Sequence, residues 1–282
     1  MLESIVRPVS AEQNPSEMVL VGIIFTMVSG LLVLQIGTSS PANTGLGLLL
    51  VAFISIPASP LLVNLFIIEG KKVRRNRSFP IPIIDRHDEV IKVLAFLFIG
   101  IIIGASILYL LLPGETAQFL FSDQLHDLSA RGVNVMSGNA IARTDFWSLI
   151  ENNTKVTLLV LVFSFVFGAG AIFIIAWNGT IIGVLIANIA QNPGRFGGIE
   201  LLPGNPFVNY LAALPITFIN LLPHGFFEFM AYFFAGVSGG ILSAAVMREK
   251  LSWDNQIIRD CAVYFLFSFV LVVIGAFIEA SL

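Results

Sequence analysis

Long runs of uncharged, apolar residues decide what this chain can fold into. A helix needs about 20 consecutive apolar residues to cross a hydrocarbon core roughly 30 Å thick, and several stretches approach that length. Of the 282 residues, 56% are hydrophobic and 12% charged, whereas ordinary soluble domains are about 25% charged. The sequence therefore predicts an all-α, polytopic transmembrane helical bundle. Its apolar segments are 18–37, 46–68, 90–112, 154–176, 206–222, 225–246 and 257–280.

An eighth apolar segment, 178–190, is shorter than the others. It begins at Asn178-Gly179 and stops before Pro193. At roughly 1.5 Å per residue, a helix of this length covers only about 20 Å. We therefore expect about seven spans and, after Asn178, one re-entrant or interfacial half-helix.

Cationic residues indicate the orientation, because Lys and Arg near helix ends are retained on the cytoplasmic side. They concentrate around segment 70–89, which predicts a cytoplasmic loop and a cytoplasmic N-terminus. If 178–190 does not cross, the stretch 247–256 is cytoplasmic too, and the C-terminus is external. An alternative role for the basic loop is binding of anionic lipid or an acidic partner. The cations in or beside it are Lys71, Lys72, Arg74, Arg75, Arg77, Arg86 and Lys92.

Three parts are expected along the chain. Residues 1–113 form an N-terminal three-span region, 114–153 an external polar loop, and 154–282 a four-span membrane domain. The formal net charge of −3 argues against nucleic acid as the main partner, because nucleic-acid binders concentrate positive charge on one face. Membrane lipid is the expected surrounding. The single cysteine, Cys261, excludes an intramolecular disulfide and is expected to be a small buried hydrophobe.

Pairs of small residues four positions apart recur inside the apolar segments. In lipid, small residues let helix backbones approach closely and so help to assemble a bundle. Internal packing is the favoured interpretation, with a homodimer face as the alternative. The pairs are Gly100 with Gly104, Ser164 with Gly168, Gly179 with Gly183, and Gly236 with Gly240.

Two interruptions of the apolar pattern predict broken helices. One is at Trp177-Asn178-Gly179, and the other is at Pro223-His224-Gly225, where proline removes an amide donor and glycine loosens the backbone. Broken helices at membrane depth are tolerated where protein or a water-lined cavity satisfies their polar groups.

Ionisable residues in the last two apolar segments form the candidate site. His224 and Glu228 are four residues apart and share a face on a helix. Glu279 lies near the end of the final segment. Charged groups at such positions cost several kcal/mol unless paired or hydrated, which marks them as candidates for ion conduction, proton coupling or binding. Alternatively, His224 and Glu228 cap a helix start, where a carboxylate is favourable.

The sequence lacks the motifs typical of zinc peptidases and of P-loop nucleotide-binding proteins. It contains no His-Glu-x-x-His and no Walker-type glycine loop. The other histidines, His87 and His126, are assigned to opposite aqueous sides, so a histidine-rich zinc site is not expected near His224. We expect no enzymatic activity, no cofactor and no metal.

Two groups of motifs resemble the stage II sporulation protein M family of integral membrane proteins. The first comprises Phe146-Trp147, Glu151-Asn152-Asn153, Gly168-x-Gly170, Trp177-Asn178-Gly179 and Gly183. The second comprises Pro223-His224-Gly225-x-x-Glu228, Gly236, Gly240 and Ile278-Glu279-Ala280. Together they cover about 146–282, and the preceding spans resemble those of long, N-terminally extended members.

The resemblance implies a non-enzymatic partner of other membrane or cell-envelope proteins, since the sporulation member assists peptidoglycan-degrading proteins. It implies Asn178, His224 and Glu228 as motif positions without a catalytic role. A multi-pass location in the cell membrane is expected. A transporter or channel component with a polar site around Asn178, His224 and Glu228 is the competing hypothesis.

Overall fold

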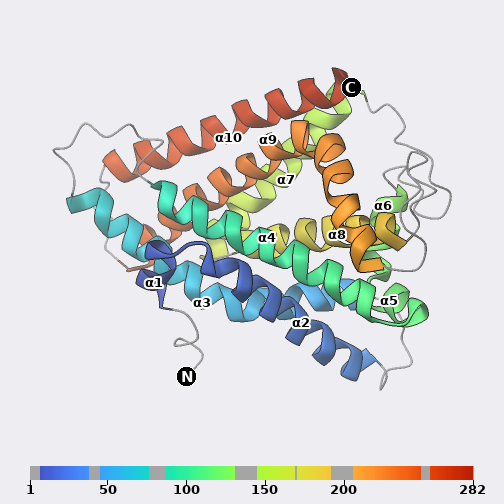
Figure 1. Ribbon diagram of the computed structural model, residues 1–282. Coiled ribbons are helices and arrows are strands. Elements are labelled where there is room, and N and C mark those ends of the chain that lie inside the picture. Colours follow the sequence, from blue (N-terminus) through green and yellow to red (C-terminus); the bar gives the residue numbers. More distant parts are fainter. Residues whose placement is uncertain are drawn as a thin grey trace.

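The computed structural model describes residues 7–37, 45–75, 87–130, 145–168, 170–191, 206–248 and 255–281. Throughout these ranges the regular elements are helices (Figure 1), which confirms the predicted fold class. They are α1 (Pro8–Gln13), α2 (Glu17–Gly37), α3 (Leu46–Arg75), α4 (Asp88–Leu111), α5 (Gly114–Leu120), α6 (Ser122–Ala130), α7 (Phe146–Phe167), α8 (Ala171–Gln191), α9 (Pro206–Arg248) and α10 (Asn255–Ser281).

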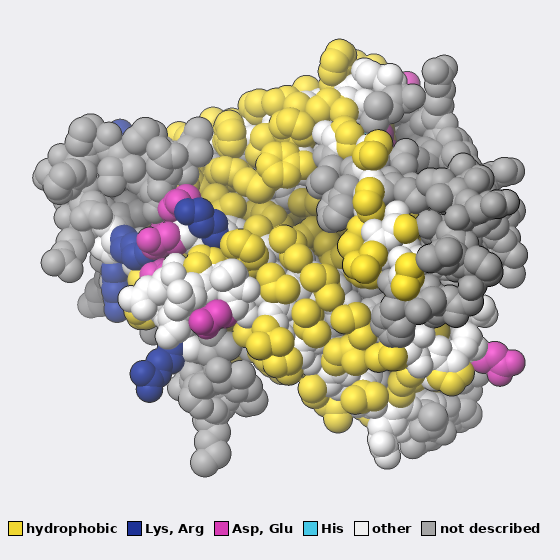
Figure 2. Space-filling model, viewed as in Figure 1, with side chains coloured by type: hydrophobic (Ala, Val, Ile, Leu, Met, Phe, Trp, Pro, Cys, Tyr) yellow, Lys and Arg dark blue, Asp and Glu magenta, His cyan; other side chains and the backbone are white. Residues whose placement is uncertain are grey.

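Within the described residues, seven helical stretches are long and apolar enough to cross a membrane. Figure 2 shows hydrophobic side chains over the middle of the bundle and most of the described charges in this view gathered at one end. This pattern is that of a multi-pass membrane protein, as the sequence predicted. The stretches are α2, α3 as far as Lys72, α4, α7, α8, α9 from Pro223 to Val246, and α10 from Ile257.

Helices α2, α4 and α8 run in the same direction. Gly22 of α2 faces Gly100 of α4, and the Ser106 hydroxyl of α4 donates to the Gly183 carbonyl of α8 at 2.8 Å. Their first residues lie where α3 ends and α4 begins, which we call the basic-loop end. Their last residues lie at the opposite end of the bundle, which we call the far end.

The predicted half-helix after Asn178 is wrong, because α8 is one continuous helix from Ala171 to Gln191. The Asn178 amide donates to the Ile174 carbonyl at 2.8 Å, so this polar side chain is satisfied within its own helix. The interruption lies earlier, at Gly168, whose φ of 73° ends α7. It also divides the predicted segment 154–176.

Helix α9 corrects a second prediction. Residues 206–222 and 225–246 were expected to be two spans joined by a turn at Pro223, but they belong to one helix with Pro215 and Pro223 inside it. Figure 1 shows α9 changing direction close to the C-terminal end of α10. An internal proline removes a hydrogen bond and kinks a helix. The part before the bend runs across the bundle, and the candidate span within α9 is Pro223–Val246, after the bend.

The small-residue pairs pack inside the bundle, as predicted. A Cβ on Gly100 would lie 2.2 Å from the Val19 carbonyl oxygen of α2, and one on Gly183 would lie 2.6 Å from the Ile102 carbonyl oxygen of α4. Gly236 faces Ala171 of α8, and Gly240 faces the Phe66 ring of α3. These glycines let helix backbones approach to contact distance.

The segment 114–153, expected to be a polar loop, contains α5, α6 and the first turns of α7. Gln124 of α6 is fully buried. Its Nε2 donates to the Gly47 carbonyl at 3.3 Å and to the Thr180 hydroxyl at 3.2 Å. The start of this segment is therefore packed onto α3 and α8.

Candidate functional site

Polar side chains from three helices meet towards the far end of the bundle. His224, Glu228 and Tyr232 follow one another at intervals of four along α9, so they share one face of that helix. Asn153 comes from α7 and Glu279 from α10. We call these five residues the far-end cluster.

Asn153 connects α7 to two successive turns of α9. It is 4% exposed; its Nδ2 donates to Glu228 Oε1, and the Tyr232 hydroxyl donates to its Oδ1 at 3.1 Å. One amide thus satisfies a carboxylate and a phenol inside a candidate span. Unpaired polar groups are costly at that depth, so this chain of hydrogen bonds stabilises the contact between the helices.

His224 lies one turn before Glu228 and is also buried. Among the described residues, its Nδ1 has no hydrogen-bond partner. Glu279 of α10 interacts with it electrostatically. The close approach of α10 depends on Gly275, where a Cβ would lie 3.1 Å from Glu228 Cγ and 3.3 Å from the His224 carbonyl oxygen.

The structure brings together three predicted site residues, His224, Glu228 and Glu279, and separates two others. Asn178 is bonded within α8, and Gly179 packs against Phe98 and Ile101 of α4. Both are explained by packing of α8.

The remaining predicted site residues, Pro223 and Gly225, lie in α9 at the start of its spanning part. Pro223 is exposed and Gly225 is buried. The predicted helix start at Pro223 is therefore wrong, and Glu228 does not cap free amides there. Its carboxylate is instead a hydrogen-bond acceptor for α7.

Sequence reasoning missed Asn153 and Tyr232 as members of the cluster. The hydropathy pattern places Asn153 in the polar loop, because the predicted apolar segment starts at residue 154. Tyr232 continues the four-residue spacing of His224 and Glu228, which is the signal that points to it.

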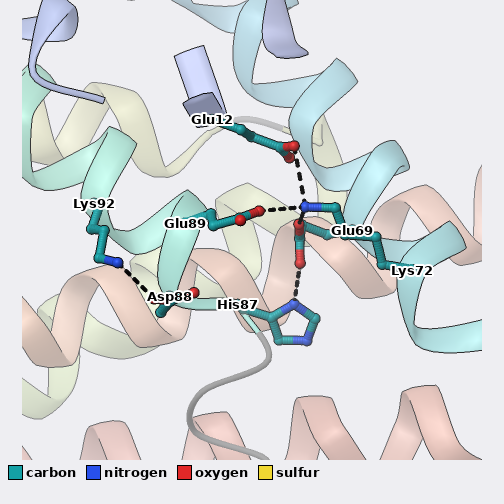
Figure 3. A network of polar contacts seen from close by, with 7 residues as sticks. All are labelled: Glu12, Glu69, Lys72, His87, Asp88, Glu89 and Lys92. Atoms are coloured by element: carbon teal, nitrogen blue, oxygen red, sulfur yellow. Dashed lines mark hydrogen bonds and ion pairs between the residues drawn. The ribbon is translucent and has the colours of Figure 1, made fainter. Parts of the chain in front are cut away.

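A second polar network lies at the basic-loop end (Figure 3). Lys72 of α3 pairs through its Nζ with Glu69 Oε1 at 2.8 Å, Glu89 Oε2 of α4 at 2.6 Å, and Glu12 Oε2 of α1 at 3.1 Å. Glu69 Oε2 lies 2.5 Å from His87 Nδ1, with Glu69 fully buried and His87 2% exposed. We call these five residues the Lys72 network.

The Lys72 network joins helices that are far apart in sequence. The ring of His87 packs edge-on against Tyr264 of α10, with centroids 5.1 Å apart, so four helices meet there. Oxygens of Glu12, Glu69 and Glu89 lie within 4.8 Å of one another, a spacing that also suits a metal ion. Here the Lys72 ammonium pairs with all three and supplies the positive charge.

Sequence reasoning missed this network because it places Lys72 in the basic loop and His87 on an aqueous side of the membrane. Lys72 is instead neutralised by acids of α1, α3 and α4. It therefore contributes little of the free positive charge that an anionic lipid would meet.

The seven candidate spans and the apolar surface define an integral, multi-pass helical membrane protein. More particularly, the chain belongs to the stage II sporulation protein M family, whose sequence model matches residues 93–282, well over half of the chain. The match begins in α4, whereas the motifs noted above begin at residue 146. Helix α4 from Val93 onward and the segment 114–153 therefore belong to the part shared with the family.

A protein of Methanocaldococcus jannaschii, described as uncharacterized, is 31% identical to this chain over 140 residues. The aligned region covers 48% of this chain and 68% of that protein. No solved structure matches the chain.

Proposed function

We propose that this chain is a non-enzymatic assembly partner in a membrane or cell-envelope complex, with the far-end cluster serving as an internal brace. The observation that carries this proposal is the bridge from Glu228 through Asn153 to Tyr232. Polar groups that satisfy one another across helices hold a bundle in one arrangement. A fixed far end suits a protein that presents its α5–α6 region to other membrane proteins, to envelope proteins or to a second copy.

A transporter or channel component is the second candidate function. The buried His224, with Nδ1 lacking a partner among the described residues, favours it, as does the nearby carboxylate of Glu279. Intramembrane histidines and acids recur in proton relays.

Flux measurements on Glu228→Gln and Glu228→Leu separate the two candidates. If the cluster is a brace, Glu228→Gln keeps a hydrogen-bond acceptor for Asn153, so its free energy of unfolding falls by only about 1 kcal/mol. The leucine variant leaves the Asn153 amide unsatisfied, so it loses about 2–3 kcal/mol. Thermal unfolding in detergent measures both changes. The reconstituted wild-type protein is expected to show no proton or ion flux.

Ion or proton flux in wild-type liposomes that disappears in folded Glu228→Gln would exclude the pure brace and favour the transporter. Asn153→Leu is the matched variant on the partner helix. It is expected to be destabilised at least as much as Glu228→Leu, because it removes the bond to Glu228 and also the bond from Tyr232.

For the orientation, we propose a cytoplasmic basic-loop end and an external far end. The cationic loop 70–89 supports this arrangement. In a Cys261→Ser background, Ser129→Cys in α6 is expected to react with an impermeant thiol reagent from outside intact cells. Reaction only after permeabilisation would reverse the orientation.

The sequence predicts cytoplasmic access for a cysteine placed at Asn76 and for one placed at Gly197, and both positions lie outside the described residues. The sequence-based expectation of cytoplasmic access at Gly197 depended on the half-helix at 178–190. Because α8 is continuous, its last described residue, Gln191, lies at the far end. The orientation proposed above therefore places Gln191 on the external side.

A further inference from the structure

We propose that α1 is a detachable latch docked on the ends of α3 and α4 at the basic-loop end, and that the charge on Glu12 controls its docking. This inference concerns regulation and goes beyond the assembly role proposed above. It rests on how α1 is attached, on the charge balance of the Lys72 network, and on the connection between α1 and α2.

Two neighbouring residues attach α1 to the bundle. Ala11 is fully buried, and Glu12, with a side chain 10% exposed, forms the 3.1 Å ion pair with Lys72. The helix has only six residues. Isolated helices shorter than about 12–15 residues are marginal in water, so α1 depends on docking to remain helical.

The chain can turn between α1 and α2 without disturbing the membrane spans. Asn14 caps α1 with non-helical dihedral angles, φ −131° and ψ 68°, and Pro15 follows it. A hydrogen bond of 3.1 Å from the Glu17 amide to the Asn14 carbonyl then starts α2. A rotation at this corner would leave the hydrogen bonds within α2 in place.

The charges around Glu12 are unevenly balanced. Glu12 faces Lys72 and Glu69 of α3 and Glu89 of α4, and His87, the N-cap residue of α4, lies behind Glu69 (Figure 3). Three carboxylates thus share one ammonium. Asp88 and Lys92, also of α4, pair with each other at 2.7 Å. When ionised, Glu12 brings a third negative charge to an ammonium that already has two carboxylates.

The direction of the pH response follows from the docked state. Burial raises the pKa of the Glu12 carboxyl above its ordinary value of 4.5, Lys72 opposes this, and Glu69 and Glu89 add to it. A released Glu12 is in water and has the ordinary value. Docking therefore favours the protonated form, so α1 is held most firmly in acid and loosens as the pH rises through the raised value.

Spin labels at Val9→Cys in α1 and Ile99→Cys in α4 test the latch in the full chain, with Cys261→Ala removing the native thiol. Both positions are exposed, at 54% and 42%. Distance distributions are measured in lipid nanodiscs at about pH 5 and about pH 8. We expect one narrow distribution in acid and a growing, broader component at the higher pH.

Substitutions at Glu12 identify the controlling group. Glu12→Gln, which mimics the protonated acid and keeps an acceptor for Lys72, is expected to give the narrow distribution at both pH values. Glu12→Lys, which places a cation beside Lys72, is expected to give the broad one at both. Glu17→Gln, an exposed acid one helix away, is expected to behave like the wild type.

A pH response that survives in Glu12→Gln would show that another group controls α1 and would overturn the proposal. A narrow distribution in every variant at both pH values would show that α1 does not detach, with the same consequence. Because Glu12→Gln keeps both size and hydrogen bonding, the comparison does not depend on the folding of Glu12→Lys.

Discussion

Replacing Lys72 with methionine is expected to lower the free energy of unfolding by about 3 kcal/mol. The substitution removes the cation shared by Glu12, Glu69 and Glu89 while keeping most of the side-chain volume. Breaking a fully buried pair costs about 3–5 kcal/mol because a charge is left unpaired. Lys72 is 36% exposed, which places the effect at the lower end. The melting temperature in detergent measures the loss.

Lys92→Met is the matched control on the next helix. Lys92 forms a single short ion pair, with Asp88 at 2.7 Å, and both side chains are about half exposed. Such surface pairs contribute about 0.2–1 kcal/mol. Adding Glu69→Gln to Lys72→Met is expected to restore part of the stability, because it removes the most buried of the three charges. Equal melting temperatures for Lys72→Met and Lys92→Met would contradict this account of the network.

Replacing Gly100 with alanine is expected to lower the free energy of unfolding by at least about 2 kcal/mol. The added Cβ would lie 2.2 Å from the Val19 carbonyl oxygen and 2.9 Å from the Val19 carbonyl carbon. Backbone atoms cannot rotate away as a side chain does, so α2 must move away from α4. Overpacking a tight interior typically costs about 1–3 kcal/mol. Thermal unfolding in detergent is again the measurement.

Two further glycines provide controls for Gly100→Ala. Gly70 in α3 has nothing within 4 Å of an added Cβ, so Gly70→Ala is expected to be neutral or stabilising by up to about 1 kcal/mol. At Gly30 the clash is with the end of the flexible Leu108 side chain, so Gly30→Ala is expected to cost less than Gly100→Ala. A stability for Gly100→Ala equal to that of Gly70→Ala would refute the close contact between α2 and α4.

The approximate number of membrane-spanning helices could be predicted from the sequence. Which apolar segments form those helices could not. Hydrophobic length limits the number of helices that span, and this led to about seven. Asn178 and Gly179 interrupt the hydropathy pattern without interrupting the helix, because Asn178 bonds to its own backbone and Gly179 packs against α4. Whether Pro223 starts a new helix or kinks an existing one depends on packing around it.

The candidate site could likewise be predicted from the sequence only in part. Spacing along one helix placed His224 and Glu228 on a common face, since residues four apart in a helix are neighbours whatever surrounds them. No local pattern indicates that Asn153 of α7 bonds to Glu228, because that contact joins residues 75 positions apart in sequence.

Sequence composition and tertiary contacts therefore determine different properties of this protein. The sequence by itself determined the membrane environment, the helical class and the charged segment at the basic-loop end, because these depend on hydrophobic length and composition. Only the tertiary structure decided that 206–222 and 225–246 belong to one bent helix and that Lys72 is shared by three acids. Those outcomes depend on which helices pack together, and in lipid that choice depends on close backbone contacts and on interhelical hydrogen bonds.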